Sequence, residues 1–176
     1  MVNKIKLFDP KIGKEEELAV KRTMKSGFWA SGAGIENVKK FEKMFSKYTK
    51  TKNSVAVNSG TAALNLALSV FDIKNKEVIL PSLSFISTAH AIILNGGTPI
   101  FVDVDPKTLC IDPIQIKKSI STKSIMILPV HFAGMPANME KIKEIATENK
   151  LHLIEDAAHA VGSTYNHKKI GSHGDL

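Results

Sequence analysis

The chain has 176 residues, the usual length of one domain, and its 43% hydrophobic and 23% charged residues are typical of folded globular proteins. Its net charge of +7 comes from scattered lysines, and Arg22 is the only arginine. Because recognition of bases and phosphates favours arginine, nucleic acid is not an expected partner. No apolar run approaches the roughly 20 residues that cross a bilayer, and the first residues lack the apolar stretch of a signal peptide, so we expect a cytoplasmic protein without a membrane partner. The single Cys110 excludes an internal disulfide.

The first quarter of the chain predicts two amphipathic helices. Residues 15–25 place Leu18, Val20 and Met24 among charged residues, and Gly27 suits a left-handed cap at the end of this helix. A glycine-rich loop with the only tryptophan follows. The second helix is predicted over residues 36–48, where apolar residues recur at helical spacing.

From residue 54 onwards, short apolar strands alternate with helices. Strands are expected at 54–57, 78–80, 99–104, 125–129 and 151–154, and helices at 61–71, 86–95, 113–120 and 139–150. This alternation predicts a three-layer α/β fold with a mainly parallel sheet covered on both faces. Ligands of such sheets bind at the carboxyl ends of the strands, where the sequence has Asn58, Pro81, Asp103, His131 and Asp156.

The segment around Gly60, Thr61 and Ala62 is a candidate phosphate site. A short apolar strand runs into a Ser-Gly-Thr turn and then into an Ala/Leu-rich helix. This arrangement points backbone N–H groups and the positive end of a helix at one place, and glycine lets an anion approach the backbone closely. The alternative is an ordinary helix cap made by Ser59 or Thr61.

Asp156 follows the last predicted strand, and His159 lies three residues further on. A carboxylate can keep a pyridine nitrogen protonated, so the phosphate cradle, Asp156 and His159 together match the needs of pyridoxal phosphate. The alternative for Asp156 is a helix cap or a surface carboxylate. Glu155 should point to the opposite face of the strand. A metal site built from His152, Glu155 and His159 matches no known ligand spacing, so none is predicted.

Several motifs appear in one order along the chain: NSGTAA from Asn58, PSLSF from Pro81, FVDVDP from Phe101, PVHFAG from Pro129, EDAAHAVG from Glu155 and YNHKKIGSHGD from Tyr165. Together they resemble the DegT/DnrJ/StrS sugar aminotransferases, from about Leu7 to the last residue. The resemblance implies the aspartate aminotransferase (type I) fold with pyridoxal 5'-phosphate as cofactor. It also implies amino transfer from a glutamate-type donor to a nucleotide-linked keto-sugar, for amino-sugar and surface polysaccharide biosynthesis, in a homodimer.

The resemblance also suggests roles for single residues. Phe85 would lie on the face of the cofactor ring, although an aromatic residue after a strand can equally be core. His159 would approach the phenolic oxygen or aldehyde end of the cofactor. Weaker candidates for substrate binding are Phe28, Trp29, Ser31 and His131; for His131 a buried position at a strand end is the alternative.

Read through this resemblance, residues 1–176 are the N-terminal part of the large cofactor-binding domain. The lysine that would form the Schiff base is expected beyond Leu176, because Lys168 and Lys169 occupy another motif position. No catalytic residue is therefore assigned within the chain, and the chain alone is expected to be inactive. Two alternatives stay open: a sugar dehydratase on the same scaffold, with histidine in place of that lysine, and a non-catalytic truncated or regulatory product.

Overall fold

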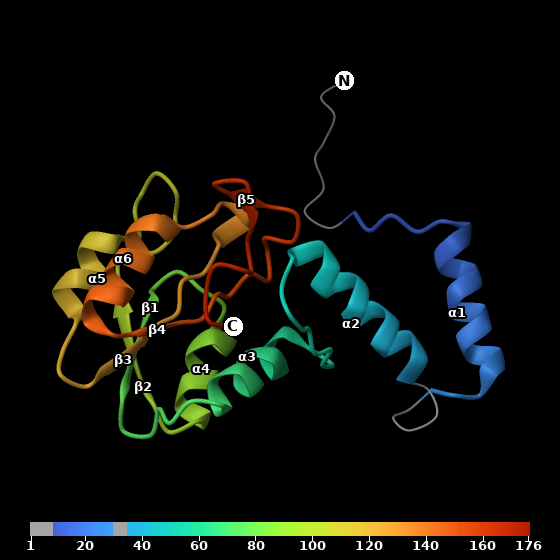
Figure 1. Cartoon of the computed structure of the whole chain (residues 1–176), viewed down its shortest axis with the longest axis horizontal. Helices are drawn as coiled ribbons and strands as arrows, with labels where there is room; N and C mark the ends of the chain where they lie inside the picture. Colours follow the sequence, from blue (N-terminus) through green and yellow to red (C-terminus); the bar gives the residue numbers. More distant parts are fainter. Residues whose placement is uncertain (1–8, 30–34) are drawn as a thin grey trace. The chain divides into compact units, whose positions relative to one another are not determined.

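The computed structural model describes residues 9–29 and 35–176, which divide into two units, Met1–Phe41 and Glu42–Leu176 (Figure 1). The first unit contains α1 (Lys14–Ser26) and the start of α2 (Ile35–Thr49). Acidic residues in the first turn of α1 and Lys25 in the last complement the helix dipole. Gly27 ends α1 with a φ of 72°, which confirms the predicted left-handed cap.

The second unit holds the remaining helices and all strands of the described ranges. The helices are α3 (Gly60–Ser69), α4 (Ile86–Leu94), α5 (Pro113–Ser119) and α6 (Met139–Asn149), with a short 3-10 turn at Phe132–Gly134. The strands are β1 (Glu77–Pro81), β2 (Thr98–Val102), β3 (Ser124–Ile127), β4 (His152–Leu153), β5 (Thr164–Tyr165) and β6 (Lys168–Lys169).

Four parallel strands form the main sheet in the order β2-β1-β3-β4. Glu77 of β1 pairs with Thr98 on one side and with Ser124 on the other. The chain therefore leaves β1 towards one edge and later returns to its other side, which creates a switch point between the carboxyl ends of β1 and β3. Binding sites of open parallel sheets lie at such points.

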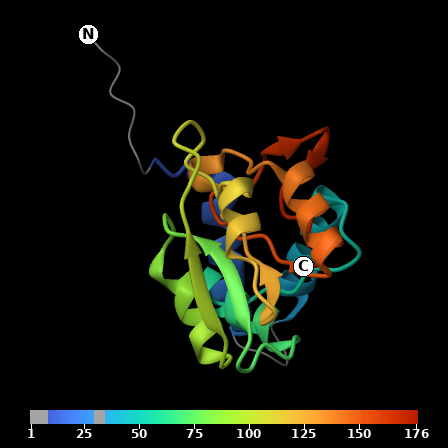
Figure 2. The ribbon, with the colours of Figure 1, turned by 90° about the vertical axis from the view of Figure 1, so that its left-hand side faces the viewer.

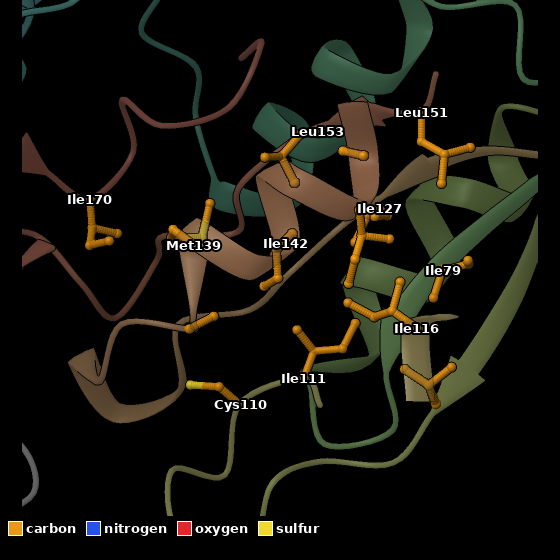
Figure 3. Packing of buried hydrophobic residues seen from close by; sticks show 14 of the residues in the cluster. Ile79, Cys110, Ile111, Ile116, Ile127, Met139, Ile142, Leu151, Leu153 and Ile170 are labelled. Carbon is orange, nitrogen blue, oxygen red and sulfur yellow. The ribbon is translucent and has the colours of Figure 1, made fainter. Parts of the chain in front are cut away.

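Alternating strand residues build a separate core on each face of the sheet. Figure 2 shows the helices that cover the two faces. Ile79, Ile127 and Leu153 face α5 and α6 and belong to the cluster of Figure 3. The opposite cluster joins the sheet to α3 and α4 and includes Leu68 and Ile92, which are fully buried. The mainly parallel sheet covered on both faces that the sequence predicts is thus confirmed.

Two local features differ from the prediction. Residues 54–57 form no strand; the amide of Ala56 donates to Glu42 Oε1 at 2.8 Å, and the side chain of Val55 is 70% exposed. The antiparallel pair β5–β6 was not predicted, and its turn places Asn166 and His167 at positive φ. Over the described part of the chain, no helix is long and apolar enough to span a membrane.

Candidate functional site

The first turn of α3 presents unpaired backbone donors. The Ser59 side chain caps the helix by accepting from the Ala62 amide at 3.1 Å, and the Ser59 carbonyl accepts from Ala63. This leaves the amides of Gly60 and Thr61 without an acceptor among the residues that the structure describes. A Cβ atom at Gly60 would meet nothing within 4 Å, so this turn faces open space.

Asp156 lies just beyond the carboxyl end of β4, in a parallel bridge with Val130. Its residue is 9% exposed, and its carboxylate has two partners. Thr88 Oγ1 donates to Oδ2 at 2.8 Å and the Ala158 amide donates to Oδ1 at 3.3 Å. Each carboxylate oxygen can accept a further hydrogen bond, so Asp156 retains room for a donor from a ligand.

A pair of hydroxyl groups holds the Asp156 carboxylate in place. Ser84 Oγ donates to Thr88 Oγ1 at 2.6 Å, and the Thr88 hydroxyl in turn donates to Asp156. Thr88 is fully buried in the first turn of α4, directly after the loop that leaves β1. Thr88 was not assigned from the sequence, because its partner Asp156 lies 68 residues further along the chain.

Asp156 and α3 lie on the same side of the sheet. Ile154 belongs to the core cluster under α3 and α4, and Asp156, two residues further, points the same way, towards Thr88 of α4. α3 and α4 also pack against one another. Leu153 and Glu155 face the opposite side, as the strand alternation predicts for Glu155.

Two further candidates line this end of the sheet with exposed side chains. Phe85 occupies the N-cap position of α4 and is 74% exposed, so its ring is free to contact a ligand. His159 is exposed; its Nδ1 accepts from the Ala133 amide at 3.4 Å, and its ring packs edge-on against Phe132 at 6.1 Å. Because Nδ1 accepts, the proton of the neutral His159 ring lies on Nε2.

The weaker candidates are His131, Phe28, Trp29 and Ser31. His131 is fully buried, with Nδ1 accepting from the Ala137 amide at 3.1 Å and Nε2 bonded to Glu155 at 3.0 Å. This placement favours the core alternative for His131. Phe28 and Trp29 belong to the first unit, where Trp29 Nε1 donates to the carbonyls of the last turn of α1. Ser31 lies outside the described residues.

A groove of about 570 Å³ lies between α5 and α6, on the opposite face of the sheet from Asp156. It contains none of the site residues that the sequence predicts. Its lining mixes both signs of charge, with Asp112 and Glu144 beside Lys117 and Lys141. The groove therefore has no electrostatic preference for an anionic phosphate.

Comparison with known proteins gives concordant results. A model of the DegT/DnrJ/EryC1/StrS aminotransferase family matches residues 10–176. The chain is 44% identical over 167 residues to spore coat polysaccharide biosynthesis protein SpsC of Bacillus subtilis. That match covers 94% of this chain and 42% of SpsC, so the chain spans less than half the length of this relative.

Two solved structures resemble the fold closely. An aminotransferase from Psychrobacter cryohalolentis superposes with a TM-score of 0.90 at 36% identity, over 94% of this chain and 42% of its own. A GDP-4-keto-6-deoxymannose-3-dehydratase with a trapped PLP-glutamate geminal diamine also gives 0.90, at 29% identity, over 97% of this chain and 45% of its own. The same backbone thus occurs in an aminotransferase and in a dehydratase.

Proposed function

Because this chain belongs to the DegT/DnrJ/EryC1/StrS aminotransferase family, we propose that it forms the cofactor-binding, N-terminal part of a sugar aminotransferase that uses pyridoxal 5'-phosphate. The observation that carries the proposal is the Asp156 carboxylate, fixed by Thr88 on the same side of the sheet as the open first turn of α3. The two features offer partners for opposite ends of the cofactor, its ring nitrogen and its phosphate.

The residues present fit this cofactor. The amides of Gly60 and Thr61, with the Thr61 hydroxyl, would bind the phosphate, and the Asp156 carboxylate would accept a hydrogen bond from the protonated ring nitrogen. A bound pyridinium ring supplies an electron sink for the carbon that loses a proton. Thr88 holds the Asp156 carboxylate in one orientation, Phe85 would cover one ring face and the exposed Nε2–H of His159 would donate to an oxygen of the cofactor.

The substrates and the assembly are part of the same proposal. The similarity to the spore coat polysaccharide biosynthesis protein SpsC supports a role in polysaccharide biosynthesis. We infer a nucleotide-linked keto-sugar as amino acceptor, a glutamate-type amino donor and a cytoplasmic homodimer. The lysine that binds the cofactor is proposed to follow Leu176, and Phe28, Trp29 and Ser31 are proposed to face the substrate. α1 has no buried residue, and its Leu18, Val20 and Met24 are exposed, as a subunit contact requires.

A dehydratase on the same scaffold is the second candidate, and the likeness to the GDP-4-keto-6-deoxymannose-3-dehydratase structure supports it. The residue that distinguishes the two activities is expected beyond Leu176: lysine for amino transfer, histidine for dehydration. A truncated or regulatory product that lacks catalysis is the third candidate. The length of the natural protein distinguishes it from both enzymes.

The test uses the whole natural protein, supplied with pyridoxal phosphate, glutamate and a set of nucleotide-linked keto-sugars. Mass spectrometry of the products separates the candidates, because amino transfer replaces a carbonyl oxygen by an amino group while dehydration removes a hydroxyl group. We expect an amino-sugar product and equimolar 2-oxoglutarate. A deoxy-sugar product would favour the dehydratase, and a natural protein of only 176 residues without turnover would contradict both enzymatic candidates.

A further inference from the structure

Glu155 is a buried carboxylate that the chemistry proposed above leaves unused. It precedes Asp156 on the same extended segment, but its side chain points to the opposite side and has no exposed surface. A carboxylate so far from water must be stabilised by donors within the protein. The identity of those donors shows what Glu155 does in the fold.

Four donors converge on this carboxylate. Oε2 accepts from His131 Nε2 at 3.0 Å and from the Gly171 amide at 3.1 Å, while Oε1 accepts from the amides of His173 at 2.5 Å and Gly174 at 2.7 Å. The His131 ring is neutral with its proton on Nε2, because its Nδ1 accepts from the Ala137 amide.

The carboxylate is held in its ionised form. Burial alone would raise the pKa of Glu155, but the hydrogen bonds from His131 and the three amides together lower it below its ordinary value. All four bonds are therefore charge-assisted, and such bonds are shorter and stronger than bonds between neutral groups.

Three of the four donors belong to one short segment, Gly171 to Gly174. Here the chain leaves the β5–β6 hairpin and turns to run beside β4, where the Asp175 amide donates to the Leu153 carbonyl at 2.7 Å. Gly174 lies so close to β4 that an added Cβ would be 2.5 Å from the Leu153 carbonyl oxygen. The segment has no regular secondary structure of its own, so Glu155 supplies the acceptors that a helix or strand would otherwise provide.

We propose that Glu155 is a positioning residue: it fixes the backbone of Gly171–Gly174 and so sets the path of the chain that continues beside β4 towards the cofactor. The catalytic consequence rests on the proposed function, in which the lysine that binds the cofactor follows Leu176. In that case Asp156 binds the cofactor, and Glu155 fixes the segment that leads to the lysine. A displacement of about 1 Å at a reacting group can cost a hundredfold in rate.

The test compares Glu155→Gln and Glu155→Asp with the matched control Glu144→Gln in the whole protein. Glu144 is an exposed glutamate of α6. Deuterium uptake is measured by mass spectrometry for peptides covering residues 168–176 and 60–68, together with cofactor affinity, kcat and KM. In Glu155→Gln we expect at least tenfold faster uptake in residues 168–176, unchanged uptake in 60–68 and cofactor affinity within threefold of wild type. kcat should fall at least tenfold while KM changes less than threefold.

Glu155→Asp keeps the charge but has a shorter reach, so its effects should be smaller and in the same direction. If Glu155→Gln yields no folded protein, the same measurements on Glu155→Asp provide the test. Unchanged uptake in residues 168–176 would overturn the positioning role, and so would faster uptake with unchanged kcat. If the wild-type protein turns over no keto-sugar while Glu155→Gln still loosens residues 168–176, the proposed function fails and the anchoring of this segment stands.

Discussion

At the scale of single residues, Glu155 and Asp156 are adjacent along an extended segment, but their carboxylates lie on opposite sides of it and in different environments. The Asp156 carboxylate accepts only two hydrogen bonds from the protein, whereas the Glu155 carboxylate has no exposed surface and accepts four. The difference comes from the alternation of side chains along an extended segment. Asp156 can therefore bind a ligand, while Glu155 is fully used within the protein.

Replacing Asp156 should abolish turnover in the whole protein even with the cofactor at saturation. In Asp156→Ala the ring nitrogen loses the charge that holds its proton, and Asp156→Asn accepts a hydrogen bond but carries no charge. We expect kcat to fall by at least about a hundredfold in both variants, as for the loss of one preorganised electrostatic contact. Steady-state kinetics with added pyridoxal phosphate measure this, and near-normal turnover in Asp156→Ala would exclude Asp156 from the mechanism.

Thr61→Val should act on cofactor affinity and leave the chemistry intact. The substitution removes one hydroxyl donor from the first turn of α3 and keeps the backbone amides. Loss of one hydrogen bond to a charged group costs about 1.5–3 kcal/mol, so the Kd for pyridoxal phosphate should rise by about ten- to a hundredfold. Equilibrium dialysis measures the Kd. An unchanged affinity would remove the Thr61 hydroxyl from the phosphate site.

Acid should destabilise the fold in two ranges of pH. The pKa of His173 is lowered from its ordinary 6.5, chiefly because burial disfavours the charged ring, and the pKa of Glu155 lies below its ordinary 4.5 because its hydrogen bonds outweigh the effect of burial. In both cases the unfolded chain takes up protons before the folded chain does, so stability falls as pH decreases, from about 6.5 for His173 and from about 4.5 for Glu155.

Urea unfolding of the whole protein between pH 7.5 and 4 should show this decline. His173→Gln should reduce the slope between about pH 7 and 5.5 and leave the slope below pH 5 unchanged. Equal slopes for wild type and His173→Gln over the upper range would contradict a lowered pKa for His173.

At the scale of elements, the helices and paired strands of the second unit were predictable because their apolar periodicity is local. The strand expected at 54–57 was not, because a strand also needs a neighbour. In the structure the Ala56 amide bonds to the side chain of Glu42, and no strand of the described residues pairs with this segment. The β5–β6 hairpin was missed for a different reason. Its turn residues Asn166 and His167 both have positive φ, and this pair is uncommon in hairpin turns.

The candidate site shows the same contrast between patterns within a short stretch of sequence and contacts between residues far apart along the chain. Gly60, Thr61 and Asp156 could be proposed from the sequence because turn chemistry and strand ends can be recognised in short stretches. Thr88 was missed because its hydrogen-bond partner, Asp156, is 68 residues away along the chain. The Glu155 anchor was missed likewise, since its acceptor role depends on the path of Gly171–Gly174. Contacts between distant segments become visible only in three dimensions.

Helix α5 offers a matched pair of substitutions that tests its orientation. Ile116 is fully buried in the core, whereas Ile114, two residues earlier, is 63% exposed. Ile116→Ala should lower the free energy of unfolding by about 2–5 kcal/mol, because it leaves a cavity, and Ile114→Ala should cost less than about 1 kcal/mol. Urea denaturation measures both. Equal losses would show that α5 is rotated from the orientation described here.

At the scale of the whole molecule, the second unit exposes much apolar surface on its α3–α4 side. Leu66 and Val70 at the end of α3 and Ile93 and Leu94 at the end of α4 are all at least 46% exposed. The matched relative SpsC and the matched structures extend well beyond the length of this chain. Surfaces of this kind in a folded protein are normally covered by a further segment or a partner.

We therefore expect residues 1–176, purified alone, to aggregate or to require a partner, and to show no aminotransferase activity. The test adds pyridoxal phosphate, reduces with borohydride and maps any modified lysine, with light scattering to follow the association state. Diffuse labelling of several lysines without turnover is the expected result. Stoichiometric labelling of a single lysine together with turnover of a keto-sugar would show that these residues suffice for activity.

The strand order β2-β1-β3-β4 also bears on how the protein is made. β2 can pair with β1 as soon as it emerges, β3 then adds to the free edge of β1, and β4 adds to β3. Among these four strands of the described residues, none has to insert between two that are already paired. At roughly 5–20 residues per second of synthesis, the sheet can thus grow outward from β1 while the ribosome is still translating. Within these four strands, the nascent chain does not have to break an established pairing.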